Sequence, residues 1–435
     1  MFKAFHPLYI DPGTGSALFS IVIGAVAVVY FFSRAFLIKL KSFFFGQKGA
    51  QGLSNKYRYV IYAEDKRYWS LFKPVLDEFE NRELELLYLT SSEDDPVFNA
   101  GYRYILPEFI GKGNKAYARL NMLSASFVLA TTPGLDVYQW KKSKTVNHYS
   151  HVLHAVVDAT LYRMFALDYF DSVLMTGAYQ ADDIRKIERL HKLPEKQLVT
   201  VGCSYLDEYE KLMRQIHQEE PHEFTVLVSP SWGPSSLLIR YGEKLLDPLA
   251  DTGWRILIRP HPQSKISESK NLAALTERYR HNKNFVWDYE RDNIRSLSKA
   301  DVMISDFSGI IFDYVFLRDK PVIYVNYEYD LRPYDAHFLP DVELWQVKTL
   351  RKIGVELREA DFGNIKNIIM EASSSAVLNE ARQEAKETAW QYRGMAGKLT
   401  ADFMVSTVNR FQNQADFETG SGGIDQKKPE GIKPE

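Results

Sequence analysis

Residues 301–314 read Asp-Val-Met-Ile-Ser-Asp-Phe-Ser-Gly-Ile-Ile-Phe-Asp-Tyr. The apolar run at 302–304 predicts a buried strand that ends at Asp306, and Ser308 and Gly309 then open a helix. Small polar residues at a helix N-terminus leave backbone N–H groups pointing outward, where the helix dipole favours an anion. In a parallel α/β sheet, such a turn lies at the carboxyl end of a strand, where ligands bind. The stretch predicts a phosphate-binding turn or, alternatively, a plain helix capped by Asp306 or Ser308.

Strands and helices alternate on both sides of this stretch. Strands are expected at 59–62, 84–89, 127–130, 145–150, 172–176, 198–201, 224–228, 255–258, 285–287 and 321–325. Helical spacing is found at 69–81, 152–167, 181–190, 206–218, 237–246, 292–299 and 374–412. Such alternation predicts α/β domains with parallel sheets covered by helices on both faces.

The pattern restarts after Pro221-His222, which indicates a domain junction. We therefore expect two Rossmann-like, doubly wound domains facing a cleft, at 56–220 and 221–412. The tail 413–435 is rich in Gly, Lys and Pro and lacks apolar periodicity, which predicts disorder.

Composition excludes several classes of protein. A chain of 435 residues is long enough for about two to three domains. The formal net charge is −2, and no basic stripe alternates with aromatic residues, so we expect no nucleic-acid partner. Cys203 is the single cysteine, which excludes an intramolecular disulfide and any metal site built from a cysteine cluster.

The N-terminus has a different character. Residues 17–32 carry no charge, and the run through Arg34 is roughly 20 residues long, enough to span a bilayer. A cleaved signal peptide would need its basic residues before the apolar run, whereas Arg34, Lys39 and Lys41 follow it. We therefore expect a membrane anchor at 1–45, with a transmembrane helix at about 16–38. The positive-inside rule predicts a single-pass protein of the cell membrane, with its N-terminus outside and its catalytic domains in the cytoplasm.

Three polar loops follow predicted strands of the second domain. They are Ser229 to Ser231, Arg259 to His261, and Asp306 to Gly309. Parallel strands end at one edge of a sheet, so these loops should converge and present hydroxyls, a cation, an imidazole and a helix N-terminus. That set suits a nucleotide diphosphate. The two prolines around His261 restrict its loop; the alternative is that His261 only makes a hydrogen bond in a rigid turn.

The first domain contains His148, His151 and His154 at three-residue spacing. On one helix they would share a face and suggest a metal site, but matching carboxylates are missing. If the strand runs through about Ser150, His151 lies just past its end and faces the cleft. An imidazole there is suited to general base catalysis. The alternative is that all three histidines pack or cap at a strand–helix junction.

The sequence resembles the CDP-glycerol glycerophosphotransferase family of teichoic-acid-type polymer synthesis over about 57–411. The resemblance rests on Arg-Pro-His-Pro at 259–262, on Ser-Asp-Phe-Ser-Gly at 305–309 with Asp313, and on Lys-Pro at 320–321. Val-Gly-Cys-Ser-Tyr-Leu-Asp at 201–207 is similar to the family's Gly-x-Pro-x-x-Asp turn. Ser-Pro-Ser-Trp at 229–232 is similar to its Pro-Thr loop.

The resemblance implies a GT-B fold that binds CDP-glycerol between its domains and transfers glycerol phosphate to a hydroxyl acceptor, releasing CMP. It implies that His261 stabilises charge on the diphosphate and that Ser308 and Gly309 hold the phosphates. The family's other histidine lies in a Trp-His-Gly motif, for which His151 is the best match and His148 the second. This sequence lacks the tryptophan and glycine of that motif, and Gly309 replaces a second serine of the family pattern.

These observations predict a membrane-anchored transferase of cell-envelope polysaccharide synthesis that attacks the donor in line. The predicted catalytic residues are His151 and His261. The predicted substrate-binding residues are His148, Ser229, Ser231, Arg259, Asp306, Ser308, Gly309 and Asp313. We expect no cofactor and no protein metal site; the partners are a nucleotide-activated donor, a lipid-linked or polymeric hydroxyl acceptor, the membrane and, as one option, a second copy of the chain. The alternatives are a GT-B glycosyltransferase that uses a nucleotide sugar and a non-catalytic membrane-tethered assembly factor.

Overall fold

The computed structural model describes residues 56–216, 222–290, 292–326 and 330–420, with side chains through residue 414. Contacts divide the chain into residues 1–56 and 57–435, and the description below concerns the second of these parts.

The predicted localisation needs correction. The expected anchor at 1–45, with its span at about 16–38, lies outside the described residues. In the ranges that the structure describes, no helix is long and apolar enough to cross a bilayer. Even the long helix α15 (Ala396–Gly420) is interrupted by charged side chains such as Lys398, Asp402 and Arg410. The predicted single-pass localisation in the cell membrane therefore finds no support in the helices that the structure describes.

The first sheet has seven parallel strands in the order β3-β2-β1-β4-β5-β6-β7. Their bounds are β1 Tyr57–Ala63, β2 Leu86–Thr90, β3 Ile105–Phe109, β4 Ala125–Ala130, β5 Tyr149–Val152, β6 Ser172–Met175 and β7 Gln197–Thr200. The central strands form nearly continuous buried apolar runs, as strands covered on both faces do. The strand order reverses between β1 and β4, and ligands of doubly wound sheets bind beside such a switch point.

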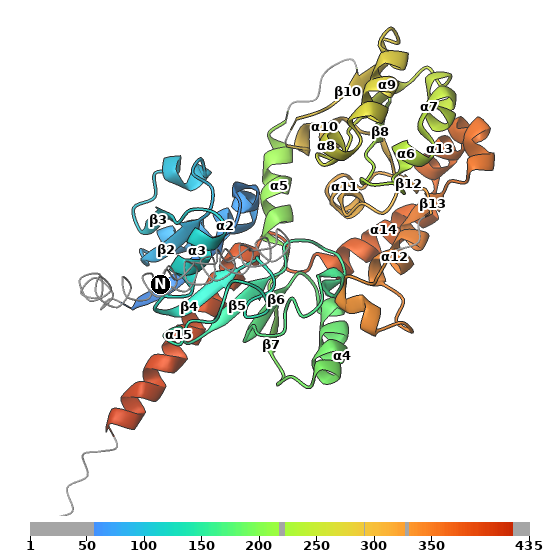
Figure 1. Ribbon diagram of the computed structural model, residues 1–435. Coiled ribbons are helices and arrows are strands. Elements are labelled where there is room, and N and C mark those ends of the chain that lie inside the picture. The colour runs from blue at the N-terminus through green and yellow to red at the C-terminus, as the bar shows by residue number, and fades with distance from the viewer. Residues whose placement is uncertain (1–55, 217–221, 291, 327–329, 421–435) are drawn as a thin grey trace, which may run out of the picture. The chain divides into compact units, whose positions relative to one another are not determined.

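The second sheet has six parallel strands in the order β10-β9-β8-β11-β12-β13. Their bounds are β8 Thr225–Val228, β9 Arg255–Ile258, β10 Phe285–Trp287, β11 Val302–Ser305, β12 Val322–Tyr324 and β13 Gly354–Glu356. This sheet repeats the order of the first, with its switch point between β8 and β11. The expected α/β class with parallel sheets is confirmed (Figure 1). The domain bounds 56–220 and 221–412 stay predictions.

Helices cover both sheets. The α-helices are α2 Trp69–Asn81, α3 Asn114–Leu120, α4 Ala181–His191, α5 Ser204–Arg214, α6 Leu237–Arg240, α7 Gly242–Ala250, α8 Ser264–Ser267, α9 Ser269–Tyr279, α10 Ile294–Lys299, α11 Ile310–Arg318, α12 Trp345–Ile353, α13 Ile365–Ser374, α14 Ala376–Ala389 and α15. The 3₁₀ turns are η1 Lys66–Tyr68, η2 Pro96–Asn99, η3 Ala159–Leu161, η4 Ala178–Gln180, η5 Asp335–Phe338 and η6 Glu359–Asn364.

The C-terminal helix returns to the first sheet. Phe403, Met404 and Val408 of α15 belong to the same buried cluster as Phe72 of α2 and Phe127 of β4. Figure 1 shows α15, in red, beside β4. The first half of the fold therefore completes its core with residues from the end of the chain.

Asp207 of α5 fixes the start of α15. Its Oδ1 accepts hydrogen bonds from Trp390 Nε1 and Gly394 N, both at 2.8 Å, and its Oδ2 accepts one from Ala396 N at 3.1 Å. The preceding turn requires Gly202, because its φ is +92° and a Cβ there would lie 2.5 Å from the Gln391 carbonyl oxygen. The motif at 201–207 is thus a structural joint between α5 and the C-terminal segment.

Two expected elements near residue 150 are wrong. The expected strand at 145–150 lies instead at Tyr149–Val152, because Ser143 and Thr145 join their hydroxyls in a local turn at 3.0 Å. The expected helix at 152–167 is a loop with the single turn η3. Its apolar residues mimic a helical period but pack in two places, Leu153 and Leu167 in one buried cluster and Val156 in another.

The C-terminal region also differs from expectation. The helical stretch expected at 374–412 breaks at residues 390–395, where Gly394 has a φ of +77° and binds Asp207. Helix α15 runs to Gly420, into the tail that was predicted to be disordered from 413. The part of α15 before residue 409 is fixed by its apolar contacts with the first sheet, and the helix continues from there. Residues 421–435 lie outside the described residues.

Candidate active site

Three predicted loops lie at the carboxyl ends of adjacent strands β9, β8 and β11. Ser305 Oγ at the end of β11 donates to the carbonyl oxygen of Ser229 at 2.6 Å, and Ser229 N donates to Ile304 O at 3.0 Å. Arg259 N donates to Val228 O at 2.9 Å and joins the third loop to the other two. The convergence of these backbone segments that the sequence predicts is therefore present.

Asp306 organises the loops from inside. Its side chain is 3 % exposed and accepts hydrogen bonds from three backbone N–H groups: Ser231 at 2.8 Å, Phe307 at 2.7 Å and Leu237 at 2.9 Å. Burial raises its pKa above the ordinary value for a carboxyl, and the three donors oppose that rise. Both oxygens are occupied by protein donors, so Asp306 holds the loop after β8 and the start of α6.

His261 has one ring nitrogen committed and one open. Its Nδ1 accepts a hydrogen bond from Gln263 N at 3.1 Å, so the neutral ring carries its proton on Nε2. Within the described residues Nε2 has no partner. The ring stacks on the half-exposed Trp232 with centroids 6.2 Å apart, and burial lowers the pKa of the imidazole. His261 therefore presents an N–H donor at the strand ends.

The turn before α11 supplies further donors. The first N–H groups of a helix have no i−4 acceptor within the helix. At the start of α11, Ile311 N and Phe312 N bond back to Ser308 O and Gly309 O, at 3.2 and 3.1 Å, and the N–H groups of Ser308, Gly309 and Ile310 have no protein acceptor among the described residues. Gly309 has an ordinary φ of −59°, and an added Cβ would meet only Val157 Cγ1, at 3.8 Å. A serine at position 309, as in the family pattern, would fit the backbone without strain.

The side chain of Arg259 is engaged away from these donors. Its guanidinium forms an ion pair with Asp288 and donates to Glu290 O at 2.8 Å. The pair ties β9 to the loop after β10. Arg259 is 7 % exposed, so the structure places it as a loop brace, and its predicted contact with substrate stays a prediction.

Asp313 and His148 lie in the packed interior and not among the three loops. Asp313, in α11, accepts a hydrogen bond from Tyr205 of α5 at 3.3 Å, and burial raises its pKa to about 7. The His148 ring stacks on Phe127 at 4.9 Å, and its Nε2 lies 2.8 Å from Ser172 Oγ. Burial lowers the His148 pKa to about 4. Both side chains are therefore engaged with the protein. Ser231, in contrast, belongs to the loop cluster, and its buried hydroxyl has no hydrogen-bond partner there.

The structure separates His151 from His154. His151 lies within β5, is 0 % exposed and has its Nδ1 buried without a partner. His154 lies two residues past the strand end and is partly exposed. His151 was expected just past the end of this strand, but the strand ends at Val152, so His151 lies inside it and His154 is the histidine that follows the strand end.

A polar cluster surrounds His154 at the first switch point. Its Nδ1 lies 2.9 Å from Thr131 Oγ1, after β4, and 3.1 Å from the Tyr162 hydroxyl. Tyr68, after β1, places its ring edge-on at 5.3 Å. Burial, together with the Arg67 charge, lowers the His154 pKa to about 4. The imidazole is therefore neutral at physiological pH. Among the described residues, no three acidic, histidine or cysteine side chains are grouped as a metal site would need.

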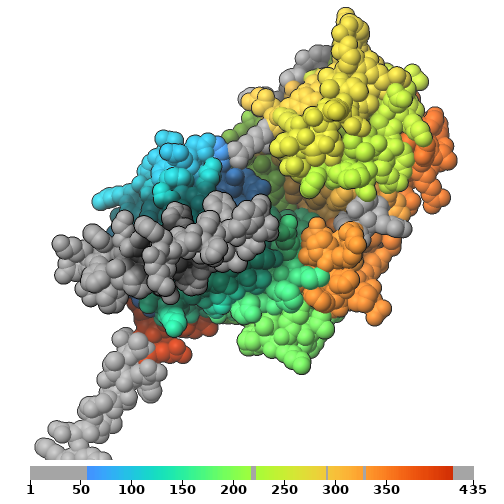
Figure 2. Space-filling view, in the orientation of Figure 1, coloured from blue at the N-terminus to red at the C-terminus, as the bar shows by residue number. Residues whose placement is uncertain are grey.

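The loop after β5 also contacts the second half of the fold. Val157, three residues past His154, lies beside Gly309 of the α11 turn. Asp335 N donates to Tyr162 O at 3.1 Å, and Asp158 accepts from the first two N–H groups of α12 at 2.9 Å. The segment around η5, in orange, lies at the surface beside α4, in green (Figure 2). The loop that contains His154 and the turn before α11 therefore contact each other where Val157 lies beside Gly309.

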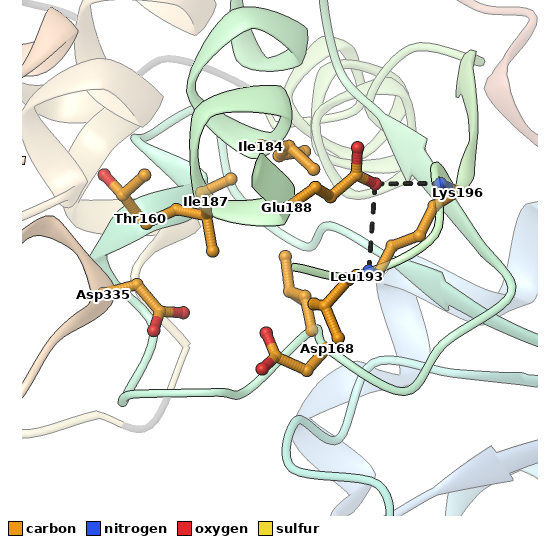
Figure 3. A pocket seen from close by; sticks show the side chains of 10 residues that line it. Thr160, Asp168, Ile184, Ile187, Glu188, Leu193, Lys196 and Asp335 are labelled. Carbon is orange, nitrogen blue, oxygen red and sulfur yellow. Dashed lines mark hydrogen bonds and ion pairs between the residues drawn. The ribbon is translucent and has the colours of Figure 1, made fainter. Parts of the chain in front are cut away.

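A small cavity lies near this contact, lined by Thr160, Asp168, Glu188, Lys196 and Asp335 among others (Figure 3). Lys196 N donates to Glu188 Oε1 at 2.9 Å, and the Lys196 ammonium lies 3.8 Å from the same oxygen. Asp335 accepts from Phe165 N at 2.8 Å, and burial raises its pKa to about 6. None of the predicted site residues lines this cavity, so it is a structural feature beside the candidate site.

Comparison with known proteins supports the resemblance. Residues 239–347 match the sequence model of the family described as CDP-Glycerol:Poly(glycerophosphate) glycerophosphotransferase, a shorter range than the expected 57–411. The matched segment contains the loops of His261 and Ser308. No curated protein sequence matches the chain at a significant level.

Solved structures agree on the fold. The chain is similar to a variant of the wall teichoic acid polymerase TagF soaked with CDPG, at 15 % identity and a TM-score of 0.51, over 81 % of this chain and 89 % of that one. It is similar to a putative UDP-N-acetylglucosamine 2-epimerase from Listeria monocytogenes (11 %, TM-score 0.51, 87 % and 100 % covered). The UDP-GlcNAc 2-epimerase of Methanocaldococcus jannaschii is comparable (11 %, TM-score 0.52, 80 % and 99 % covered). These likenesses confirm the GT-B-like architecture.

Proposed function

We propose that this chain transfers glycerol phosphate from CDP-glycerol to a hydroxyl acceptor and releases CMP, as the match of residues 239–347 to the glycerophosphotransferase model suggests. The proposal rests on one observation above all. The segment that matches the family model supplies the His261 and Ser308 loops, and strand order brings these loops to the same sheet edge.

The donor's diphosphate suits this edge. The Nε2–H of His261 and the backbone N–H groups of Ser308, Gly309 and Ile310 have no protein acceptor among the described residues, and diphosphate oxygens are strong acceptors. The hydroxyls of Ser308 and Ser231 add two further polar groups. We assign to Asp306 and Arg259 the task of holding the loops, because their oxygens and guanidinium are already bonded to protein.

We propose His154, in place of His151, as the general base. The acceptor oxygen forms a bond to the phosphorus that carries glycerol, and the bond from that phosphorus to the bridging oxygen of CMP breaks. The acceptor proton passes to His154, and the electron pair leaves with the CMP phosphate, whose growing charge His261 and the α11 turn offset. His151 is fully buried and cannot touch an acceptor.

The test uses the full-length chain and CDP-glycerol labelled in its glycerol. His154→Gln should abolish transfer to a glycerol phosphate polymer or to acceptors in a lipid extract while CDP-glycerol still binds. His261→Gln should weaken donor binding. His148→Phe is the control, because the His148 ring packs among Phe127, Phe403 and Phe411 and bonds Ser172 in the interior, and it should leave transfer intact.

The rival functions make different predictions for the same preparation. Thermal-shift measurements against CDP-glycerol, CDP-ribitol, UDP-sugars and GDP-sugars identify the donor class. Stabilisation by a nucleotide sugar alone would replace the proposed donor and favour a glycosyltransferase. Stabilisation by none of these nucleotides would favour the non-catalytic assembly factor. Transfer by His154→Gln at the wild-type rate would remove that residue from the mechanism.

A further inference from the structure

The hydroxyl of Thr131 has only one proton to give, and the structure shows where that proton goes. Thr131 Oγ1 donates to the carbonyl oxygen of Val152 at 2.8 Å, and a carbonyl can only accept. The same oxygen lies 2.9 Å from His154 Nδ1. Because its proton is already used, Thr131 can only accept toward the imidazole. The proton in that second hydrogen bond must therefore belong to Nδ1.

This assignment determines the state of the other ring nitrogen. A neutral imidazole that carries its proton on Nδ1 has a lone pair on Nε2. His154 is neutral at physiological pH, since burial lowers its pKa to about 4. In the described part of the chain, Nε2 of His154 has no protein partner. The ring therefore offers an unprotonated nitrogen, which is what proton abstraction requires.

Tyr162 and His151 complete the same network. The Tyr162 oxygen lies 3.1 Å from His154 Nδ1, where it is a second acceptor for the same proton. Its own proton can then point to His151 Nε2, 3.3 Å away. The second ring nitrogen of His151 is buried without a partner, so His151 has no route to solvent. Its ring is an internal acceptor that orients the tyrosine hydroxyl.

We propose that Thr131 is a positioning residue that holds His154 in the Nδ1–H tautomer, with Tyr162 and His151 as supporting acceptors, so that Nε2 of His154 is free to take the acceptor proton. The inference rests on the proposed transferase function for its last step only; the tautomer itself is a property of the resting protein. The charged and titratable groups that face His154 are Arg67 and Tyr68 from the turn after β1, His151 from β5, and Tyr162 from its own loop.

The first measurement is nuclear magnetic resonance of the full-length chain labelled with ¹⁵N histidine, with the signals of His154 assigned by loss in His154→Gln. Two-bond proton–nitrogen correlations distinguish the tautomers. We expect Nδ1 protonated and Nε2 unprotonated at pH 7. The Nε2–H tautomer in the wild-type protein would overturn the inference, whatever the enzyme does.

Matched substitutions extend the test to catalysis. Thr131→Val keeps the shape of the side chain and removes the acceptor for His154 Nδ1, so both tautomers of His154 should be populated. The kcat should then fall about tenfold or more at unchanged KM for the donor, because a hydrogen bond contributes roughly that factor. Thr131→Ser should restore both. Thr132→Val is the control, because the neighbouring Thr132 hydroxyl is buried without a partner. Equal tautomer populations in Thr131→Val and Thr132→Val would refute the role of Thr131. If wild-type protein turns over no donor, the proposed function fails while the tautomer measurement still decides the inference.

Discussion

Asp306 offers a clear test of whether a residue holds the candidate site together or touches its ligand. Replacing Asp306 with Ala removes the acceptor of three backbone N–H groups, those of Ser231 and Leu237, which are buried, and that of Phe307, which is partly buried. A hydrogen bond to a charged group contributes about 1.5–3 kcal/mol. Relief of the carboxylate's burial, which raises its pKa, offsets part of the loss. We expect a net local loss of about 3 kcal/mol, which is on the order of 100-fold in an equilibrium constant.

Hydrogen exchange of the backbone amides measures this loss where it occurs. The amides of Ser231 and Leu237 should exchange on the order of 100-fold faster in Asp306→Ala. Asp306→Asn keeps one oxygen but turns an NH₂ group toward an N–H donor, so it should accelerate exchange mainly at whichever amide loses its acceptor. Ser308→Ala is the matched control, since its hydroxyl holds none of these amides, and it should affect CDP-glycerol binding alone. Wild-type exchange rates in Asp306→Ala would refute the structural role and restore Asp306 as a ligand contact.

Three further predictions follow from single positions. Gly202→Ala should lower the free energy of unfolding in urea by about 2 kcal/mol or more, because the added Cβ would meet the Gln391 carbonyl oxygen. Gly233→Ala is the control: Gly233 has a φ of +97° but open space around it, so this change should cost about 1 kcal/mol. Gly309→Ser should leave the unfolding free energy within about 0.5 kcal/mol and tighten CDP-glycerol binding roughly two- to tenfold in calorimetry; weaker binding would contradict this. Burial raises the Asp335 pKa from 3.8 to about 6, so the native state binds this proton more tightly than the unfolded chain does. The free energy of unfolding should therefore fall by about 3 kcal/mol as the pH rises from about 4 to 6. Asp335→Asn should lose this share of the pH dependence, and an unchanged slope would exclude Asp335 as its source.

Strand positions in the second half could be predicted closely from the sequence. The strands Arg255–Ile258 and Phe285–Trp287 fall where they were expected, because short apolar runs there are bounded by polar or proline-containing turns. In contrast, the edge strands β3 and β13 were missed. β13 is only three residues long. β3 contains Pro107 and leaves most of its side chains partly or fully exposed, so it lacks the buried run by which the other strands were recognised.

Side-chain directions could not be predicted in the same way. Residues 259 and 306 were correctly placed at strand ends, yet Arg259 turns toward Asp288 and Asp306 turns inward to backbone amides. Such choices depend on long-range partners that no local pattern encodes. The expected strand at 145–150 ends two residues too early, so His151, which was expected just past its end, lies within β5.

Helix α15 has a consequence for how the protein is made. During synthesis the first sheet emerges from the ribosome long before Phe403, Met404 and Val408, which its core requires. The apolar face beside α2 and β4 therefore stays uncovered until α15 has been made, and an exposed apolar face of this kind is prone to aggregation and bound by chaperones. A chain stopped before Ala396 should therefore expose that face, although it contains every strand of the first sheet.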